Sequence, residues 1–263
     1  MINNWISKIR EHEKKIFSQG KQDGVIEYIC DNIKVKNKFC VEFGYDSNSL
    51  TQKYPNTTNL ILNKGWNHLL LDSDYHNPKI NLYKHLLTSD NICNLFGKYN
   101  VPLEPGYISI NVDSIDLWLF KALLSKYKAC FYSVEMNSNF PIDYAITFPN
   151  DTKELWEKDR VYGASLKALN IVANDNGYSL VYAGIRNTSN HTDAFFIRDD
   201  LIENCEKPTL ESFRDIFKPM HKLCISSREN IMLDYEIWMK TKDIKKSKEG
   251  ALPICKRYLT KNE

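Results

Sequence analysis

KFCVEFGYDSNS, residues 38–49, is the stretch on which the interpretation of the whole chain depends. Its first half favours a β-strand, and its second half consists of residues that form turns. Glu42 stands near the end of the expected strand, and Gly44 follows two positions later. The pattern therefore predicts a strand over 39–43 that opens into a loop. That strand end is either an ordinary exit into a loop or the rim of a nucleotide pocket.

The same succession of strand, turn and helix recurs along the chain. Strands are expected at 39–43, 66–71, 107–112, 129–134, 178–183 and 194–197, with a short strand or a helix end at 83–87. Helical periodicity occurs at 25–33, 59–65, 89–99, 116–126 and 163–174. Strands that alternate with helices predict an α/β fold. We expect a mostly parallel, seven-stranded, Rossmann-like sheet with an antiparallel edge and helices on both faces.

The composition narrows the class of protein. The chain has 263 residues, of which 43% are hydrophobic and 26% charged, so a globular core is expected. A formal net charge of +2 supplies no strong basic field and argues against a nucleic-acid-binding protein. Seven cysteines without a CxxC pair indicate free thiols in a reducing cytoplasm. No segment reads as a secretory signal or as a membrane span.

Polar side chains follow four of the expected strands. They are Glu42 and Asp46, with the small Gly44 between them, then Asp72 and Asp74, then Asp113 and Asp116, then Glu135 and Asn137. The carboxyl ends of parallel strands meet at one edge of a sheet, where ligands bind. A single acidic residue there is unremarkable because acidic residues are poor strand formers. Their recurrence predicts a ligand with hydroxyl groups and positive charge, because crowded carboxylates repel one another.

S-adenosylmethionine supplies a ribose diol, an ammonium group and a sulfonium. Asp72, at the end of the second strand, is placed to accept two hydrogen bonds from a ribose diol. Gly44 allows the backbone to approach a ligand closely. The G-x-G-x-x-G pattern of a dinucleotide enzyme is missing, which argues against NAD and FAD.

Seven segments follow one another along the chain: SQGKQDGVIEYI (18–29), CVEFGYDS (40–47), NKGWNHLLLDSD (63–74), ISINVDSIDLWLFKAL (108–123), YSVEMNSNFP (132–141), GASLKALNIVANDNGYSLVYA (163–183) and DAFFIRDDL (193–201). As a set and in this order, they resemble the class I S-adenosylmethionine-dependent methyltransferases. The resemblance is strongest to the FkbM-type O-methyltransferases found with bacterial polysaccharide genes. Three places depart from the family pattern: Ser47 replaces a Gly, Asn111 replaces an Asp, and Ser114-Ile115 replaces the stretch that usually follows. A non-catalytic relative therefore stays open as an alternative.

The resemblance implies roles for individual residues. The first motif, which wraps the methionine part of the cofactor, corresponds to Glu42, Gly44 and Asp46. Asp72 corresponds to the ribose-binding acid, with Ser73 beside it. Asp113 corresponds to the acid beside the transferring methyl group. A loop near the cofactor pocket corresponds to Gln19 and Asp23.

Methyl transfer to a hydroxyl also needs a group that takes the proton. The candidates are Asp113, Glu135 and His191. Asp113, Glu135 and Asn137 together form an oxygen donor set that suits Mg²⁺, so a metal-assisted mechanism is a hypothesis.

The combined prediction is a cytoplasmic O-methyltransferase that modifies a sugar hydroxyl. The acceptor is expected to be a nucleotide-activated sugar or a unit of a capsular or surface polysaccharide. The alternatives are a methyltransferase of another small molecule or of a macromolecule, and a non-catalytic S-adenosylmethionine-binding module. Residues 1–202 are expected to form the cofactor-binding domain. Residues 203–263 are expected to form a helical extension, with breaks at Pro208, Pro219 and Pro253, that packs on this domain or makes a homodimer interface.

Overall fold

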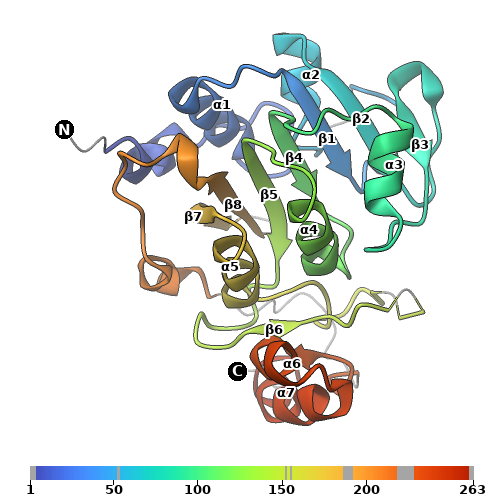
Figure 1. The fold of residues 1–263 in the computed structure, drawn as a ribbon, viewed down its shortest axis with the longest axis vertical. Helices are drawn as coiled ribbons and strands as arrows, with labels where there is room; N and C mark the ends of the chain where they lie inside the picture. Colours follow the sequence, from blue (N-terminus) through green and yellow to red (C-terminus); the bar gives the residue numbers. More distant parts are fainter. Residues whose placement is uncertain are drawn as a thin grey trace.

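A computed structural model describes residues 4–51, 54–151, 153–154, 156–185, 192–217 and 228–260 (Figure 1). Seven strands form one sheet in the order β3-β2-β1-β4-β5-β8-β7. They are β1 (Phe39–Phe43), β2 (Asn67–Asp72), β3 (Leu82–Lys84), β4 (Tyr107–Ile110), β5 (Phe131–Met136), β7 (Tyr178–Ile185) and β8 (Thr192–Arg198). β8 runs antiparallel to both of its neighbours, and all other pairs are parallel. The expected mostly parallel, seven-stranded, Rossmann-like sheet with an antiparallel edge is confirmed, with the reversed strand one position in from the edge.

Helices cover both faces of the sheet (Figure 1). One face carries the 3-10 helix η1 (Ile6–His12), α1 (Gln22–Ile33) and α2 (Thr58–Lys64), and the other carries α3 (Ile92–Lys98), α4 (Asp116–Leu124) and α5 (Leu166–Asn174). Successive residues of a strand point to opposite faces, so β1 contributes Cys40 to one core and Val41 to the other. The buried parallel strands are therefore almost continuously apolar.

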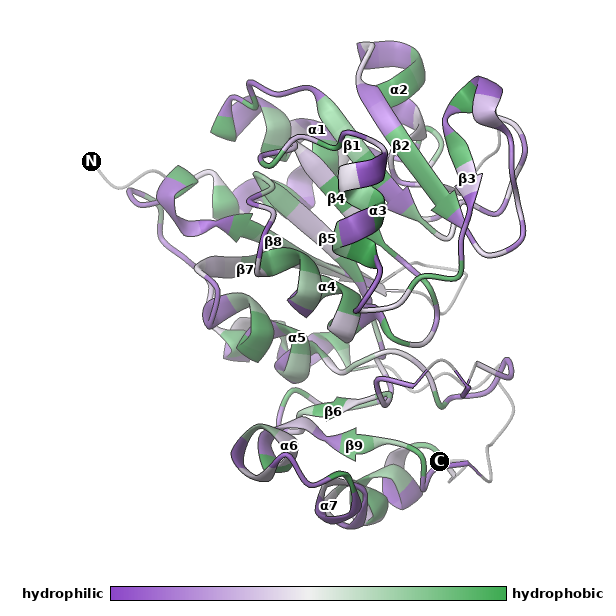
Figure 2. Cartoon of the chain, turned by 45° about the vertical axis from the view of Figure 1, so that its right-hand side comes forward, coloured by the Kyte–Doolittle hydropathy of each residue, from purple (hydrophilic) through white to green (hydrophobic). Residues whose placement is uncertain are grey.

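Helix α4 is apolar on nearly all sides because it is covered on nearly all sides. Leu117, Leu119 and Phe120 are fully buried against the sheet and the neighbouring helices. Burying each such side chain contributes roughly 1.5–3 kcal/mol. In Figure 2 much of β2 and α4 is green, whereas the loops around the sheet are largely purple.

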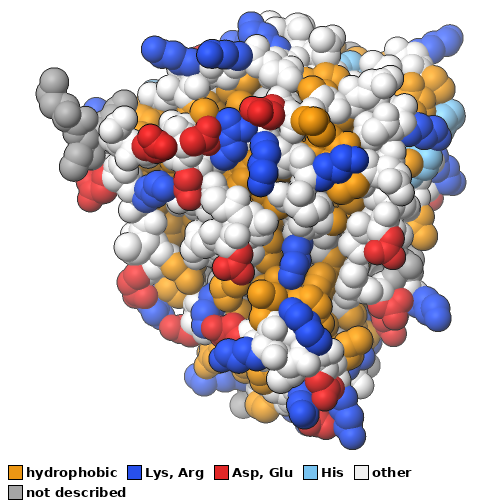
Figure 3. Space-filling view, in the orientation of Figure 1, with side chains coloured by type: hydrophobic (Ala, Val, Ile, Leu, Met, Phe, Trp, Pro, Cys, Tyr) orange, Lys and Arg blue, Asp and Glu red, His pale blue; other side chains and the backbone are white. Residues whose placement is uncertain are grey.

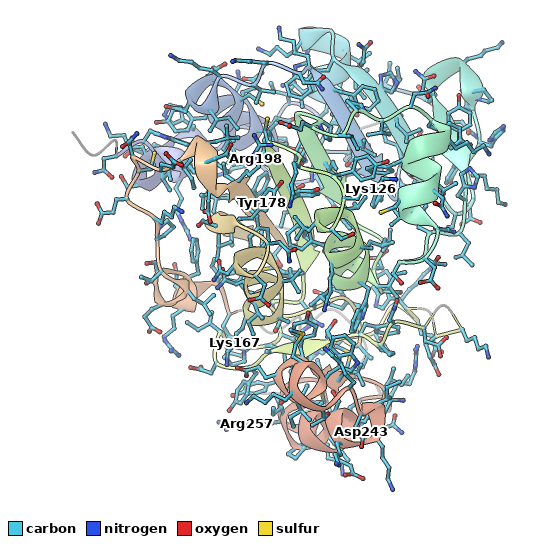
Figure 4. The ribbon with its side chains drawn as sticks, viewed as in Figure 1. Lys126, Lys167, Tyr178, Arg198, Asp243 and Arg257 are labelled. Atoms are coloured by element: carbon cyan, nitrogen blue, oxygen red, sulfur yellow. The ribbon has the colours of Figure 1, made fainter. Side chains whose placement is uncertain are left out.

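The C-terminal segment joins the loop region that follows β5. Its β9 (Leu233–Asp234) pairs antiparallel with β6 (Ile146–Thr147), and α6 (Tyr235–Thr241) and α7 (Ile244–Tyr258) follow it. The ring of Trp238 on α6 meets Trp118 on α4 edge-to-face, with centroids 4.7 Å apart. On α5, Lys167 Nζ lies 2.9 Å from Glu236 Oε2, and Asp243 caps the start of α7 (Figure 4). These contacts hold the C-terminal helices beside the edge of the sheet at which β5 ends.

In the C-terminal region one expectation is wrong, and one feature was not expected. Pro253 does not break the chain's last helix but lies inside α7. A proline removes one hydrogen bond to the residue four positions earlier, here Glu249, and both residues face solvent, where water can satisfy the carbonyl. The small β6–β9 sheet was not expected from the sequence. Pro219 lies outside the described residues, and the expected domain boundary at residue 202 stays a prediction.

The surface mixes both signs of charge. Figure 3 shows blue and red side chains interspersed on the visible face, with orange apolar areas between them. Within the described ranges, no helix has both the length and the hydrophobicity needed to cross a membrane.

Gly44 provides a test of how the loop after β1 is built. Its φ is +71°, and a Cβ atom there would lie 2.0 Å from the carbonyl oxygen of Asn111. Both effects oppose a side chain, so Gly44→Ala should lower the free energy of unfolding by roughly 1–3 kcal/mol. Urea unfolding followed by circular dichroism measures this change.

Gly97→Ala is the matched control. Gly97 lies in α3, and a Cβ atom there would meet nothing within 4 Å. Alanine favours a helix by up to about 1 kcal/mol over glycine, so this variant should be as stable as the parent or more stable. Equal losses in the two variants would contradict the tight approach of Gly44 to Asn111.

Candidate functional site

A cavity of about 490 Å³ lies at the carboxyl ends of β1, β2 and β4. Its described lining consists of Gln19, Glu42, Phe43, Gly44, Asp46, residues 54–56, Asp72, Ser73, residues 85–87, residues 111–115 and Glu154. The volume is within the range of small-molecule sites. The edge of the sheet is the one at which open α/β sheets bind ligands.

The cavity brings together most of the residues singled out from the sequence. Gln19, Glu42, Gly44, Asp46, Asp72, Ser73 and Asp113 line it. Asp23, Glu135 and Asn137 are buried but are not among its lining residues. His191 lies outside the described residues.

Asp72 is held in one orientation at the end of β2. Its Oδ1 accepts hydrogen bonds from the backbone N–H groups of Asp74 at 2.7 Å and Tyr75 at 3.0 Å. Its Oδ2 accepts no hydrogen bond from the described residues. The side chain lines the cavity although the residue is only 6% exposed. One carboxylate oxygen is thus fixed by the protein and the other is available to a ligand.

Glu42 ties the end of β1 to the start of α2. Its Oε1 accepts hydrogen bonds from the Asn56 N–H at 2.8 Å and from Ser109 Oγ at 3.3 Å. Its Oε2 accepts from the Thr57 N–H at 2.9 Å and from the Thr57 hydroxyl. Burial raises the pKa of Glu42 to about 7, and these hydrogen bonds act in the opposite direction. Both oxygens are therefore already engaged with protein donors.

Asn56 belongs to the same buried network, and the sequence analysis missed it. Its Nδ2 donates to Ser109 Oγ at 3.3 Å and to Asp193 Oδ2 at 3.2 Å. Asp193 also accepts from Gln22 Nε2 at 2.8 Å. Asn56 Oδ1 is buried and has no hydrogen-bond partner. The only signal in the sequence was an Asn-Thr-Thr run before a helix, which is common in ordinary helix starts.

Asp23 shapes the cavity from a distance. Its Oδ2 accepts hydrogen bonds from the backbone N–H groups of Ile16, Phe17 and Ser18 at 2.7–2.9 Å. It also accepts from the Ser18 hydroxyl at 2.6 Å. The loop fixed in this way continues into Gln19, whose N–H donates to the carbonyl of Tyr54 at 2.9 Å. Asp23 thus supports the part of the wall formed by Gln19 and Tyr54.

Asp113 lies on the cavity wall after β4, in a left-handed backbone conformation with φ +60°. Behind it, Asp116 is fully buried, and its Oδ1 accepts from the Val112 N–H at 2.8 Å. Burial raises the pKa of Asp116, and the nearby charge of Asp113 raises it further. The loop after β4 and the first residue of α4 thus hold two carboxyl groups close together.

The proposed magnesium ligands do not fit a metal site well. Asn137 Oδ1 already accepts hydrogen bonds from the N–H and the Nδ2 of Asn139, at 3.0 and 2.8 Å. Its Nδ2 donates to the carbonyls of Arg160 and Tyr162. In the part of the chain that the structure describes, no three His, Cys, Asp or Glu side chains are grouped as metal ligands. No step of the reaction is therefore assigned to a metal.

The comparisons with known proteins give distant likenesses only. The sequence matches no protein-family model and none of the curated proteins. Among solved structures, magnesium protoporphyrin IX methyltransferase (ChlM) from Synechocystis PCC 6803 with bound SAH has a TM-score of 0.37 and 12% identity, over 75% of this chain and 89% of that one. The pyocyanin biosynthetic protein PhzM has a TM-score of 0.34 and 9% identity, over 74% and 62%. At this distance neither likeness bears on substrate or residue roles.

The pKa of Glu42 leads to a pH dependence of stability. In the unfolded chain the carboxyl loses its proton near pH 4.5, whereas in the folded protein it keeps the proton up to about pH 7. Between these values the folded state binds more protons, so the free energy of unfolding falls as the pH rises. The contribution of Glu42 over this window is on the order of 3 kcal/mol.

Glu42→Gln cannot titrate at this position. Urea unfolding at pH 5, 6, 7 and 8 should show a shallower decline of stability for the variant than for the parent. The slope is the readout, because the glutamine amide also faces the N–H donors of Asn56 and Thr57 and lowers stability at every pH. Parallel slopes would contradict a protonated Glu42 in the folded protein.

Proposed function

We propose that this protein is an S-adenosylmethionine-dependent methyltransferase. The observation that carries the proposal is Asp72, which lines the cavity at the carboxyl end of β2 and whose Oδ2 accepts no hydrogen bond from the described residues. In Rossmann-like sheets an acid after the second strand accepts hydrogen bonds from ribose hydroxyls. The reversed strand β8 between β5 and β7 further supports a methyltransferase over a dinucleotide enzyme.

The chain's own residues suit the cofactor. Asp72 offers one charged hydrogen-bond acceptor to the ribose. Gly44 and Asn111 both line the cavity, and their backbones lie so close together that a Cβ atom at Gly44 would be 2.0 Å from the carbonyl oxygen of Asn111. S-adenosylmethionine, when bound, supplies an electrophilic methyl group on its sulfonium. Negative side chains around the cavity favour a ligand that carries positive charge.

Asp113 is the residue that we assign to proton removal. It lines the cavity after β4, whereas Glu135 lies below it and is fully buried. A carboxylate at the wall can accept the proton of an acceptor hydroxyl once that hydroxyl lies within hydrogen-bond reach. The role expected of His191 stays a prediction.

The charge of the residues that line the cavity also indicates which class of molecule accepts the methyl group. Five carboxyl side chains line the cavity, those of Glu42, Asp46, Asp72, Asp113 and Glu154, and the described lining contains no Lys or Arg. The pKa of Asp46 is raised by burial and by the charge of Asp72, as expected for crowded carboxyl groups. A phosphate group would be repelled here, while sugar hydroxyls can donate to carboxylates.

We therefore favour O-methylation of an unphosphorylated sugar hydroxyl, such as a capsular or surface polysaccharide unit, over a nucleotide-activated sugar. A methyltransferase of another uncharged or cationic small molecule is the second candidate, because the same carboxylates would accept it. The cytoplasmic location and the homodimer stay predictions.

Asp72→Asn tests the cofactor assignment. It keeps an oxygen for the N–H groups of Asp74 and Tyr75 and removes the charge that faces the cavity. Hydrogen bonds to a charged group contribute about 1.5–3 kcal/mol, so the Kd of S-adenosylhomocysteine should rise roughly 10- to 100-fold in calorimetric titration. Asp74→Asn, an exposed neighbour outside the lining, should bind like the parent. Equal affinity in Asp72→Asn and the parent would exclude Asp72 from the ribose site.

The charge of the lining predicts which acceptors react. With radiolabelled S-adenosylmethionine, we expect methylation within a panel of neutral oligosaccharides and none of the matched nucleotide-activated sugars. The repulsion between phosphate and the carboxylate-rich wall is the physical reason. Preferential methylation of the nucleotide-activated members would contradict it.

A further inference from the structure

We propose that the outer face of α7 binds the surface of an anionic phospholipid membrane. This basic face consists of Lys245, Lys246, Lys256 and Arg257, together with Ile244 at the start of the helix. None of these residues lines the cavity at the ends of β1, β2 and β4, so the inference does not depend on the proposed function.

Helix α7 has a buried side and an exposed side. Ser247, Ala251 and Cys255 are buried, and their spacing of four residues places them on one side of the helix, which packs against α6 and β9. The four cationic residues of the basic face are all exposed, and the exposed positions between the two pairs are Glu249 and Pro253. The basic face therefore extends over about 18 Å along the helix, at 1.5 Å per residue.

The charge of the C-terminal helices differs from that of the rest of the chain. Residues 235–258 contain seven Lys or Arg and three Asp or Glu, a net charge of +4, whereas the whole chain carries +2. The remainder of the chain is thus net negative. In Figure 3 blue side chains gather at the lower end of the molecule, where α6 and α7 lie. An anionic surface is attracted to this end of the protein.

The acidic residues of this segment leave most of the basic face unneutralised. Glu236 is paired with Lys167 on α5, at 2.9 Å. Asp243 caps the start of α7 and lies 3.7 Å from Lys246. Among the residues that the structure describes, the other three cationic side chains of the basic face form no ion pair. Their charges are available to a partner.

The exposed Ile244 favours a membrane over other anionic partners. It is 57% exposed and is the only exposed large hydrophobic side chain in the described part of the C-terminal helices. An apolar side chain beside lysines gains free energy at the boundary between lipid headgroups and acyl chains, and little from a polyanion in water. Anionic headgroups attract the lysines themselves. A second copy of the chain is a poor partner, because two basic faces repel each other.

The C-terminal helices lie at the same edge of the sheet as the cavity. β5 runs parallel to β4, and β4 runs parallel to β1, so the carboxyl ends of all three lie at the cavity's edge. In Figure 1, α6 and α7 lie beyond the arrowhead of β5. A membrane bound by the basic face is therefore at the cavity's end of the molecule.

The experiment measures sedimentation of the full chain with lipid vesicles. One vesicle type contains about one third phosphatidylglycerol in phosphatidylcholine, and the other contains phosphatidylcholine alone. We expect the protein to sediment with the anionic vesicles in about 0.1 M salt and to stay in solution with the neutral ones. About 1 M salt should release it, because the Debye length falls from about 10 Å to about 3 Å.

Two variants separate the charge from the apolar contact. Lys245→Gln with Lys256→Gln removes two charges of the basic face, and the partition coefficient onto anionic vesicles should fall about 10- to 30-fold. Ile244→Ala should lower it about 3- to 10-fold. All three side chains are exposed, so both variants should unfold thermally as the parent does.

Lys36→Gln with Lys38→Gln is the matched control. Both lysines are exposed and directly precede β1, so this variant loses the same charge at the opposite edge of the sheet. It should bind anionic vesicles nearly as the parent does.

Several outcomes would overturn the inference. It is wrong if the parent does not sediment with anionic vesicles, or if it sediments equally with neutral ones. Equal losses in the two double variants would mean that binding follows the net charge and not the basic face. If Ile244→Ala binds vesicles as the parent does, or if a single-stranded oligonucleotide binds the parent more tightly than the vesicles do, the partner is a polyanion and the inference is again wrong. Titration with S-adenosylhomocysteine tests the proposed function separately.

Discussion

The carboxyl group of Glu42 joins three parts of the chain that the cavity requires. It stands on β1, accepts hydrogen bonds from the start of α2 through Asn56 and Thr57, and reaches Ser109 on β4. The loop between β1 and α2 therefore folds back over the end of the sheet instead of extending into solvent. A buried carboxyl group is costly to desolvate, and donors at the start of a helix are among the groups that best offset that cost.

The need for hydrogen-bond acceptors in the loops of the wall explains why the cavity is acidic. Asp23, Glu42 and Asp72 each use at least one oxygen to fix a loop of the wall. Asp72 alone among these three both lines the cavity and has a second oxygen that accepts nothing from the described residues. Acidic side chains thus fix the loops that form the cavity wall. The negative charge of Asp72 on that wall then favours ligands that donate hydrogen bonds.

Several features followed from the sequence because they depend on neighbours in the chain. The strand over 39–43, the turn at Gly44 and the acid after β2 come from local propensity and alternation, and Gly44, Asp72 and Asp113 meet at one edge because parallel strands end together. Asn56 was not predictable, because its role depends on Asp193, which lies 137 residues later. Asn137 was assigned to a metal on residue type alone, and its oxygen is instead engaged by Asn139. The β6–β9 pairing was likewise missed, because two short strands far apart leave no periodic signal.

The crystal structure of the full chain with S-adenosylhomocysteine tests the central claim most directly. The account predicts the ribose hydroxyls within hydrogen-bond distance of Asp72 Oδ2. It also predicts that the hydrogen bonds that Glu42 accepts from Asn56 and Thr57 persist in the complex. A ligand seated elsewhere, or one with its ribose away from β2, would contradict it.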